Sequence, residues 1–176
     1  MNVANPIVRP SRSDLPFRDG VGMVLFNDRG QVWAGARQPR WAAPGEPAIW
    51  QMPQGGIKGN EVPVLAALRE LREETGALSF EPVAVLDRWL SYEVPDHLLG
   101  IALKAHYRGQ RQLWFAVRFT GDDREFDLNG GDAGVAEFSQ WAWLEPDEIR
   151  ARVVPWKRQI YSVVLDAFDA VMRADR

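Results

Sequence analysis

The chain has 176 residues, of which 46% are hydrophobic, 21 are basic and 24 are acidic, giving a net charge of −3, and it contains no cysteine. This length and composition predict a single globular domain over 1–176, without disulfides, thiolate zinc sites or a broad basic surface for DNA. No apolar run is long enough for a signal peptide or a membrane span, so we expect a cytoplasmic protein with no membrane partner.

The first part of the chain alternates apolar runs with segments rich in proline and glycine. Residues 1–16 predict a loose N-terminal arm, while VGMVLF (21–26) and QVWAGA (31–36) predict two strands joined by the turn NDRG. The segments 37–48 and 50–60 each contain several chain breakers, so we expect loops there.

The clearest predicted helix follows these loops. Asn60 is a suitable N-cap, Pro63 is tolerated in a first turn, and Gly76 is a natural C-terminal stop. At 100° per residue one side of the helix is apolar, made of Val64, Leu65, Leu68, Leu71 and Thr75. The opposite side is acidic over an arc of about 100° and carries Glu70, Glu73 and Glu74.

The second half of the chain predicts more strands and two closing helices. The runs 83–90, 112–120 and 137–144 have strand character, 145–152 predicts a short helix, and 156–174 predicts an amphipathic helix. The expected apolar stripe of the last helix is Ile160, Val163, Val164, Ala167 and Phe168. Because strands and helices mix without a regular βαβ period, we predict an α/β sandwich on a mixed sheet.

Three glutamates on one helical face call for a physical reason, since like charges at this spacing cost a few tenths of a kcal/mol per pair. One interpretation is a solvated acidic face. The other is a site for a hard divalent cation, because Mg²⁺ takes oxygen ligands and is usually held by a few carboxylates together with substrate phosphates.

The wider spacing decides between these interpretations. The segment GGIKGNEVPVLAALRELREETGA (55–77) resembles the Nudix hydrolase signature at nearly every defined position, departing only at Ala77, where a bulkier aliphatic residue is usual. The resemblance implies a Nudix α/β/α sandwich with a mixed β-sheet, in which the motif forms a loop–helix–loop beside the sheet.

The resemblance also implies roles for single residues. Glu70, Glu73 and Glu74 would ligate Mg²⁺, with Mn²⁺ as an alternative ion, and the backbone carbonyl of Gly55 would be a further ligand. Glu73 and Glu74 would also serve catalysis, by accepting a proton from the attacking water. Glu61 and Arg69 would brace the motif.

Four further segments are similar to one Nudix subgroup, which holds bacterial RNA pyrophosphohydrolases and asymmetrical dinucleoside tetraphosphate hydrolases. They are WQMPQGG (50–56), RWLSYEVP (88–95), GQRQLWF (109–115) and EFSQWAW (137–143). By this resemblance Glu137 would reach the metal and act in catalysis; the alternative is an ordinary glutamate at a strand edge.

The same resemblance suggests a substrate site. Tyr92 and Phe138 would stack on a base, although either could instead be a core residue. Arg18 and Arg37 could contact phosphate, although either could be a surface arginine. Relatives often carry a lysine where this chain has Leu113, so a phosphate contact expected there is in doubt.

The expected function is Mg²⁺-dependent removal of pyrophosphate from 5′-triphosphorylated RNA, which leaves a 5′-monophosphate. The alternative within the class is asymmetrical cleavage of diadenosine tetraphosphate to ATP and AMP, and the sequence does not separate these substrates. A non-catalytic Nudix-fold nucleotide-binding module is the alternative from another class, but such modules typically lose glutamates that this chain keeps. The loop 37–48 could alter access for a long RNA.

Overall fold

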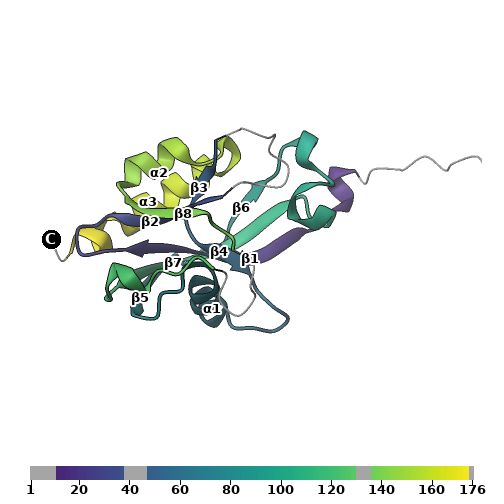
Figure 1. The fold of residues 1–176 in the computed structure, drawn as a ribbon. Helices are drawn as coiled ribbons and strands as arrows, with labels where there is room; N and C mark the ends of the chain where they lie inside the picture. The colour runs from purple at the N-terminus through teal and green to yellow at the C-terminus, as the bar shows by residue number, and fades with distance from the viewer. Residues whose placement is uncertain (1–10, 38–46, 130–135, 175–176) are drawn as a thin grey trace, which may run out of the picture.

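The computed structural model describes residues 11–37, 47–129 and 136–174, which form an eight-stranded sheet with helices on both faces (Figure 1). The elements in chain order are β1 (Phe17–Phe26), β2 (Val32–Arg37), β3 (Ile49–Gln51), β4 (Gln54–Gly56), α1 (Pro63–Thr75), β5 (Phe80–Val85), β6 (Leu90–Glu93), β7 (Gly109–Phe119), β8 (Gln140–Leu144), α2 (Pro146–Arg152) and α3 (Arg158–Arg173). No described helix is long and apolar enough to cross a membrane.

The centre of the sheet is a long parallel pair, β1 and β7, in register from Phe17 opposite Gly109 to Phe26 opposite Arg118. The main strand order is β3-β2-β1-β7-β5, with β4 paired to β1, β6 to β7 and β8 to β2. Every pair other than β1–β7 is antiparallel. The predicted mixed sheet is therefore confirmed.

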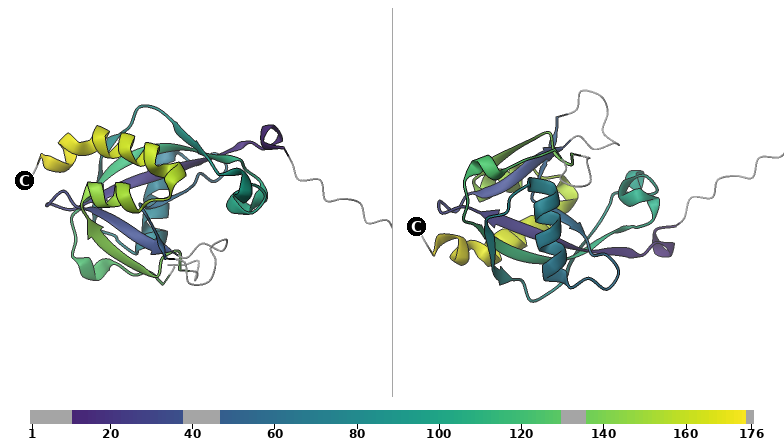
Figure 2. Two further views of the ribbon diagram at one scale, coloured as in Figure 1. Left: turned by 90° about the horizontal axis from the view of Figure 1, so that it is seen from above. Right: turned by 60° about the horizontal axis from the view of Figure 1, so that its bottom comes forward.

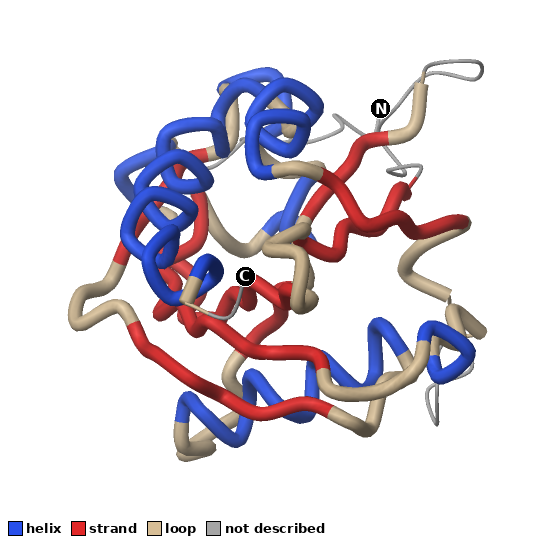
Figure 3. The backbone as a smooth tube through the Cα atoms, turned by 90° about the vertical axis from the view of Figure 1, so that its left-hand side faces the viewer, coloured by secondary structure: helices blue, strands red, loops and turns tan. Residues whose placement is uncertain are grey.

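The helices enclose the sheet in an α/β/α sandwich. Figure 2 shows α1 on one face and α3 on the other, and Figure 3 shows the strands between these helices. On the α1 face, Leu71 and Ala67 pack with the buried Met23 and Phe115. On the α3 face the buried core is Val164 and Phe168 of the helix with Trp114, Ala116 and Val24 of the sheet. The predicted fold class is thus confirmed.

The predicted single strand over 83–90 is wrong. β5 ends at Val85 and β6 begins at Leu90, and the two pair with different parts of β7. Between them Leu86 N–H donates to the Trp114 carbonyl and Arg88 N–H to the Leu86 carbonyl, forming a tight turn. The run 83–90 contains no glycine or proline, and the turn at Asp87 arises because its two halves pair with different parts of β7.

Several boundaries also differ from the prediction. The expected loop 50–60 contains β4, whose glycine-rich residues are extended because they pair with β1 at Gly20–Gly22. Asn60 is not the N-cap, because Val62 precedes Pro63 at the start of α1, whereas Gly76 ends the helix with a φ of 75° as predicted. β8 begins at Gln140 rather than residue 137.

The apolar faces of the helices are rotated slightly from the prediction. In α1, Leu65 is 56% exposed, while Ala66 and Ala67 are buried, because small side chains let this part of the helix approach the sheet closely. In α3, Ala167 is exposed, and the buried residues are Ile160, Tyr161, Val164, Leu165, Phe168 and Met172.

The expected N-terminal arm is only partly described. Its last residues form a 3-10 turn, η1 (Arg12–Asp14), held because Arg12 donates to the Val94 carbonyl and to the carboxylates of Glu93 and Asp96. Residues 1–10, and most of the predicted 37–48 loop, lie outside the described residues.

Candidate active site

The glycine-rich start of the motif is packed directly against α1. A Cβ added at Gly20 would lie 2.5 Å from the Gly55 carbonyl oxygen, and one added at Gly55 would overlap the Glu70 carboxylate. Only glycine at these two positions lets β1, β4 and the Glu70 side chain come this close. The local sequence therefore places the Glu70 carboxylate against the Cα of Gly55, and the Gly55 carbonyl against Gly20.

Arg69 connects the acidic side chains to the loop. Its guanidinium donates to Glu61 at 2.9 Å from two nitrogens, to the Gly56 carbonyl at 3.0 Å, to Glu70 at 2.7 Å and to Glu73 at 3.2 Å. The hydrogen bond from Arg69 lowers the pKa of Glu61 to about 2. These are the contacts that a bracing pair needs, because they tie the loop before α1 to the first turns of the helix.

Glu74 is the most electrostatically perturbed carboxylate of the site. It is half-buried and accepts a hydrogen bond from Gln54 N–H at 3.0 Å. Burial raises its pKa well above the usual range, and the charge of Glu137 raises it further, while the Gln54 hydrogen bond and Arg37 oppose the rise. Helix α1 and the segment before β8, far apart in sequence, thus bring Glu74 and Glu137 into one charged cluster.

Glu137 lies just before β8 and pairs with Arg37 at the end of β2. Because β2 and β8 are antiparallel neighbours with Ala36 opposite Gln140, the end of β2 and the start of β8 meet at one edge. This pairing places a predicted phosphate-contacting arginine and a predicted catalytic glutamate in direct contact.

The donor set fits a hard divalent cation. It consists of carboxylate oxygens and one backbone carbonyl, the ligands that Mg²⁺ and Mn²⁺ accept. Burial and, after it, the charge of Glu137 raise the pKa of Glu74, and a bound cation would offset both effects. Among the described residues no three acidic or histidine side chains already converge as a metal site, and Arg69 pairs with both Glu70 and Glu73, so these carboxylates would turn to meet an ion.

The two aromatic candidates are buried. Tyr92 is 7% exposed and its hydroxyl donates to Gln110 Oε1 at 2.8 Å. Phe138 is 2% exposed, and the centre of its ring lies 5.4 Å from that of Trp33 in an edge-to-face arrangement. The same ring covers Gly35. In this conformation both rings serve the core, so base stacking stays a prediction that would require a movement of the side chain.

The two arginine candidates lie beside the site. The Arg18 guanidinium covers Gly56, where an added Cβ would overlap it. The charges of Arg18 and Arg37 both lower the pKa of Tyr92, against a larger increase caused by burial. Both cations are therefore near Tyr92, at the end of the sheet that carries the motif.

Lys157 is a site residue that the sequence reasoning missed. It closes the 3-10 turn η6 (Pro155–Lys157) before α3, is 8% exposed, and its Nζ lies 5.2 Å from the centre of the Tyr92 ring. Burial and the charge of Arg37 lower its pKa to about 7, while Glu74 and Glu137 oppose this shift. The sequence does contain a signal, because Lys157 precedes Ile160, Tyr161 and Val164 by three, four and seven residues, and so falls on the apolar stripe of α3.

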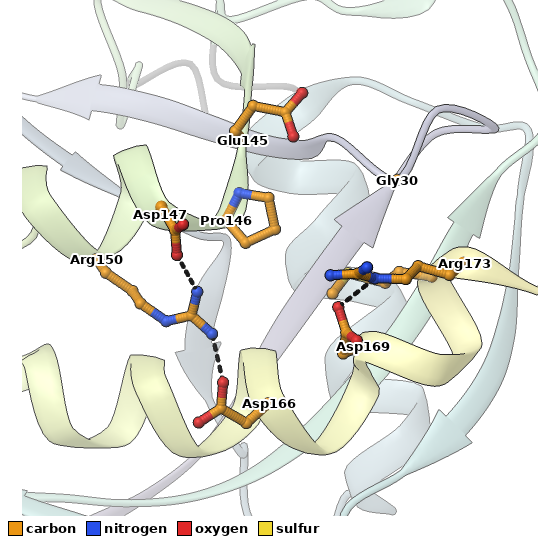
Figure 4. Close-up of a pocket in the computed structure, with 9 residues that line it drawn as sticks. Gly30, Glu145, Pro146, Asp147, Arg150, Asp166, Asp169 and Arg173 are labelled. Carbon is orange, nitrogen blue, oxygen red and sulfur yellow. Dashed lines mark hydrogen bonds and ion pairs between the residues drawn. The ribbon is translucent and has the colours of Figure 1, made fainter. Parts of the chain in front are cut away.

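A second charged region lies at the other end of β1. A hollow of about 360 Å³ opens there between the turn at Gly30, the start of α2 and the last turns of α3 (Figure 4). Arg150 pairs with Asp147 and Asp166, each at 2.6 Å, and Arg173 pairs with Asp169 at 2.7 Å. None of the predicted site residues lines this hollow, which contains opposite charges already in contact.

Comparisons with known proteins show the family to which the chain belongs. The NUDIX domain family model matches residues 16–164. The chain is 45% identical over 165 residues to an RNA pyrophosphohydrolase of Mesorhizobium japonicum, covering 92% of this chain and 95% of that protein. It is 45% identical over 163 residues to the RNA pyrophosphohydrolase of Rhizobium meliloti, covering 91% and 98%.

Solved structures share the fold at low sequence identity. A MutT protein from Methanosarcina mazei Go1 superposes with a TM-score of 0.62 at 15% identity, covering 89% of this chain and 97% of that one. A C. elegans Ap4A hydrolase in a binary complex superposes with a TM-score of 0.60 at 15% identity, covering 88% and 98%. At these identities the likeness concerns the architecture alone.

Proposed function

Because the chain belongs to the NUDIX domain family, we propose that it is an RNA pyrophosphohydrolase, which removes pyrophosphate from the 5′-triphosphate end of RNA and leaves a 5′-monophosphate. The observation that carries the proposal is the cluster of Glu74 and Glu137 beside Arg37 and Lys157. The names of the relatives that are 45% identical over most of their length support RNA as the substrate.

We assign the metal ligands to one end of the sheet. The Gly55 carbonyl and the carboxylates would hold Mg²⁺, and the carboxylates are Glu70, Glu73, Glu74 and Glu137. When bound, the ion supplies charge neutralisation at the phosphate oxygens, which phosphoryl transfer needs. Arg69 fixes the spacing of the ligands, since it bonds to both α1 and the loop before it.

Among the carboxylates, we assign proton acceptance to Glu74, with Glu137 as the alternative. A general base works best when its pKa is near the pH of the reaction. Burial and the Glu137 charge move the pKa of Glu74 in that direction. Glu73 is 38% exposed and pairs with Lys58 at 3.6 Å as well as with Arg69, so it is better suited to ligation.

Three basic side chains would bind the triphosphate. They are Arg18 and Arg37, whose charges both act on Tyr92, and Lys157, whose Nζ lies 5.2 Å from the centre of the Tyr92 ring. Forked guanidiniums match phosphate oxygens in pairs, while an ammonium acts as a point charge. Together they would offset the negative charge that the substrate brings to an acidic site.

The test is a side-by-side kcat/KM measurement with Mg²⁺ on a short 5′-triphosphorylated RNA and on diadenosine tetraphosphate, with products resolved by chromatography. We expect preference for the RNA with release of pyrophosphate. Preference for the dinucleotide, giving ATP and AMP, would replace the proposal by the second candidate, which the net charge of −3 favours because a long polyanion is repelled more than a small one. Binding of either substrate without turnover by the wild type, at saturating Mg²⁺, would indicate a binding module.

A further inference from the structure

A row of glutamines crosses the sheet from Tyr92 to Glu74. The Tyr92 hydroxyl and Gln112 Nε2 both donate to Gln110 Oε1, at 2.8 and 2.9 Å. Gln112 Nε2 also donates to Gln54 Oε1 at 3.2 Å, and Gln54 N–H donates to Glu74 Oε2 at 3.0 Å. Four side chains and one backbone amide thus form a continuous hydrogen-bonded row that ends on the proposed base.

Gln112 is the centre of this row and is placed where an apolar residue would be expected. It lies on the central strand β7, two residues before the fully buried Trp114 on the same face of the sheet, and is 1% exposed. Its Oε1 has no hydrogen-bond partner within the described residues. A buried amide with an unpaired acceptor is unfavourable for folding, so stability alone does not account for a glutamine here.

The other end of the Gln112 side chain lies beside the motif. An added Cβ at Gly20 would be 2.5 Å from the Gly55 carbonyl oxygen and 3.8 Å from Gln112 Cγ, so the carbonyl and the glutamine border the same spot on β1. The hydrogen bond to Gln54 then holds the residue that immediately precedes Gly55. β4 is only three residues long, and this side-chain contact adds to its pairing with β1.

We propose that Gln112 is a positioning residue for the reaction: through Gln54 it fixes β4, so that Gln54 N–H stays directed at Glu74 and the Gly55 carbonyl keeps its place beside Gly20. The proposal rests on the proposed function for its catalytic consequence. The hydrogen-bonded row would then connect Tyr92, which lies near the proposed substrate-binding cations, with the carboxylates on α1.

The direct test is the exchange rate of Gln54 N–H in metal-free protein, followed by NMR hydrogen exchange in Gln112→Leu. Leucine keeps the volume but cannot donate to Gln54, so we expect exchange of this amide to become at least ~10-fold faster. Trp114→Phe is the matched control, because it changes a buried residue on the same strand and face whose indole nitrogen has no partner among the described residues. There Gln54 exchange should stay within about 2-fold of wild type.

The kinetic test separates positioning from folding. With Mg²⁺ saturating, Gln112→Leu should lower kcat by about 10-fold or more while KM stays within about 2-fold, because the substrate-binding cations are untouched. The loss should be the same for RNA and dinucleotide substrates. Trp114→Phe should keep kcat even where its midpoint of urea unfolding falls.

A double-mutant cycle provides the decisive comparison, and Gln54→Ala also serves if Gln112→Leu fails to fold. Gln54→Ala removes the acceptor at a half-buried position while keeping the backbone N–H. If Gln112 acts through Gln54, the two losses in kcat are not additive, and the double variant resembles either single one. Additive losses, wild-type kcat in Gln112→Leu, or unchanged Gln54 exchange would each overturn the proposal.

These outcomes are distinct from failure of the proposed function. If the wild type hydrolyses neither substrate, the proposed function is removed, and the exchange rate of Gln54 N–H still decides whether Gln112 holds β4. If the wild type is active and Gln112→Leu equals it in kcat and exchange, only the positioning role is removed.

Discussion

The two ends of β1 carry similar side chains in different arrangements. At the hollow between α2 and α3, Arg150 contacts Asp147 and Asp166, which are largely exposed, and Arg173 contacts Asp169, which is about half exposed. At the motif end Glu74 and Glu137 are half-buried, and burial together with the charge of Glu137 raises the pKa of Glu74, although Glu137 also pairs with Arg37. Exposed ion pairs contribute little to the free energy of unfolding, and they need no ligand to neutralise them. Half-buried carboxylates close to one another destabilise the fold unless a cation binds between them. The arrangement of the charges, rather than their number, therefore distinguishes the site from the hollow.

The largest expected effect contrasts the two ends directly. We expect Glu74→Gln to lower kcat by about 10²–10⁴-fold, because it removes both a proton acceptor and a metal ligand at one position. Glu73→Gln should also lower kcat by more than ~10-fold through the loss of ligation. Asp166→Asn at the hollow is the control and should keep wild-type kcat. Steady-state kinetics at saturating Mg²⁺ measure kcat for each variant. A kcat near the wild-type value in Glu74→Gln would exclude Glu74 from the mechanism.

The second prediction concerns the aromatic residues next to the charged cluster. Phe138→Ala should lower the free energy of unfolding by about 3–5 kcal/mol, since it leaves a cavity against Trp33 and Gly35. Urea unfolding measures this. Phe138→Leu keeps most of the packing and tests base stacking separately: a raised KM with near-native stability would support stacking, whereas an unchanged KM would leave Phe138 with the core alone.

The third prediction uses the buried cation at the motif end. Lys157→Met should lower kcat/KM by about 10-fold, because a phosphate-contacting charge is lost while the packing volume is kept. Arg150→Met at the hollow should have no such effect. Equal kcat/KM in Lys157→Met and wild type would exclude the lysine from substrate binding.

Lys157 also gives a pH dependence that can be measured without metal or substrate. Its folded pKa of about 7 lies below the ordinary lysine value of 10.5, so between these values the unfolded chain binds more protons than the folded one. The free energy of unfolding contributed by this group therefore rises as pH increases from about 7 toward 10. The difference in unfolding free energy between wild type and Lys157→Met, measured by urea unfolding in EDTA, should rise over this pH range. A difference that does not change with pH would mean that Lys157 is solvated.

The sequence predicted the motif end of the molecule better than its other parts. The pattern from Pro63 to Gly76 identified α1 and its C-cap, because helix periodicity and cap chemistry are local properties. The role of the carboxylates follows from the family resemblance and stays a prediction. The division of 83–90 into β5 and β6, and the short strand β4, depend on pairing with β7 and β1, which local pattern does not encode. Lys157 was missed because a lysine near a helix start is usually solvated, and only its position on the apolar stripe of α3 signals burial.

The smallest expected effect concerns the ion pairs of the hollow, which we expect to contribute little to the free energy of unfolding. Arg150 bridges α2 to α3 through Asp166, which is 74% exposed, and it also pairs within α2 with Asp147, which is 93% exposed. Pairs of this kind contribute about 0–1 kcal/mol and are weakened by salt. Asp166→Asn should therefore change the free energy of unfolding by less than ~1 kcal/mol at low salt, and by still less when the urea titration is repeated in 1 M NaCl. A loss of unfolding free energy well above ~1 kcal/mol that is insensitive to salt would show that Arg150 holds α2 against α3. The two ends of β1 would then differ in their chemistry, and both would contribute to stability.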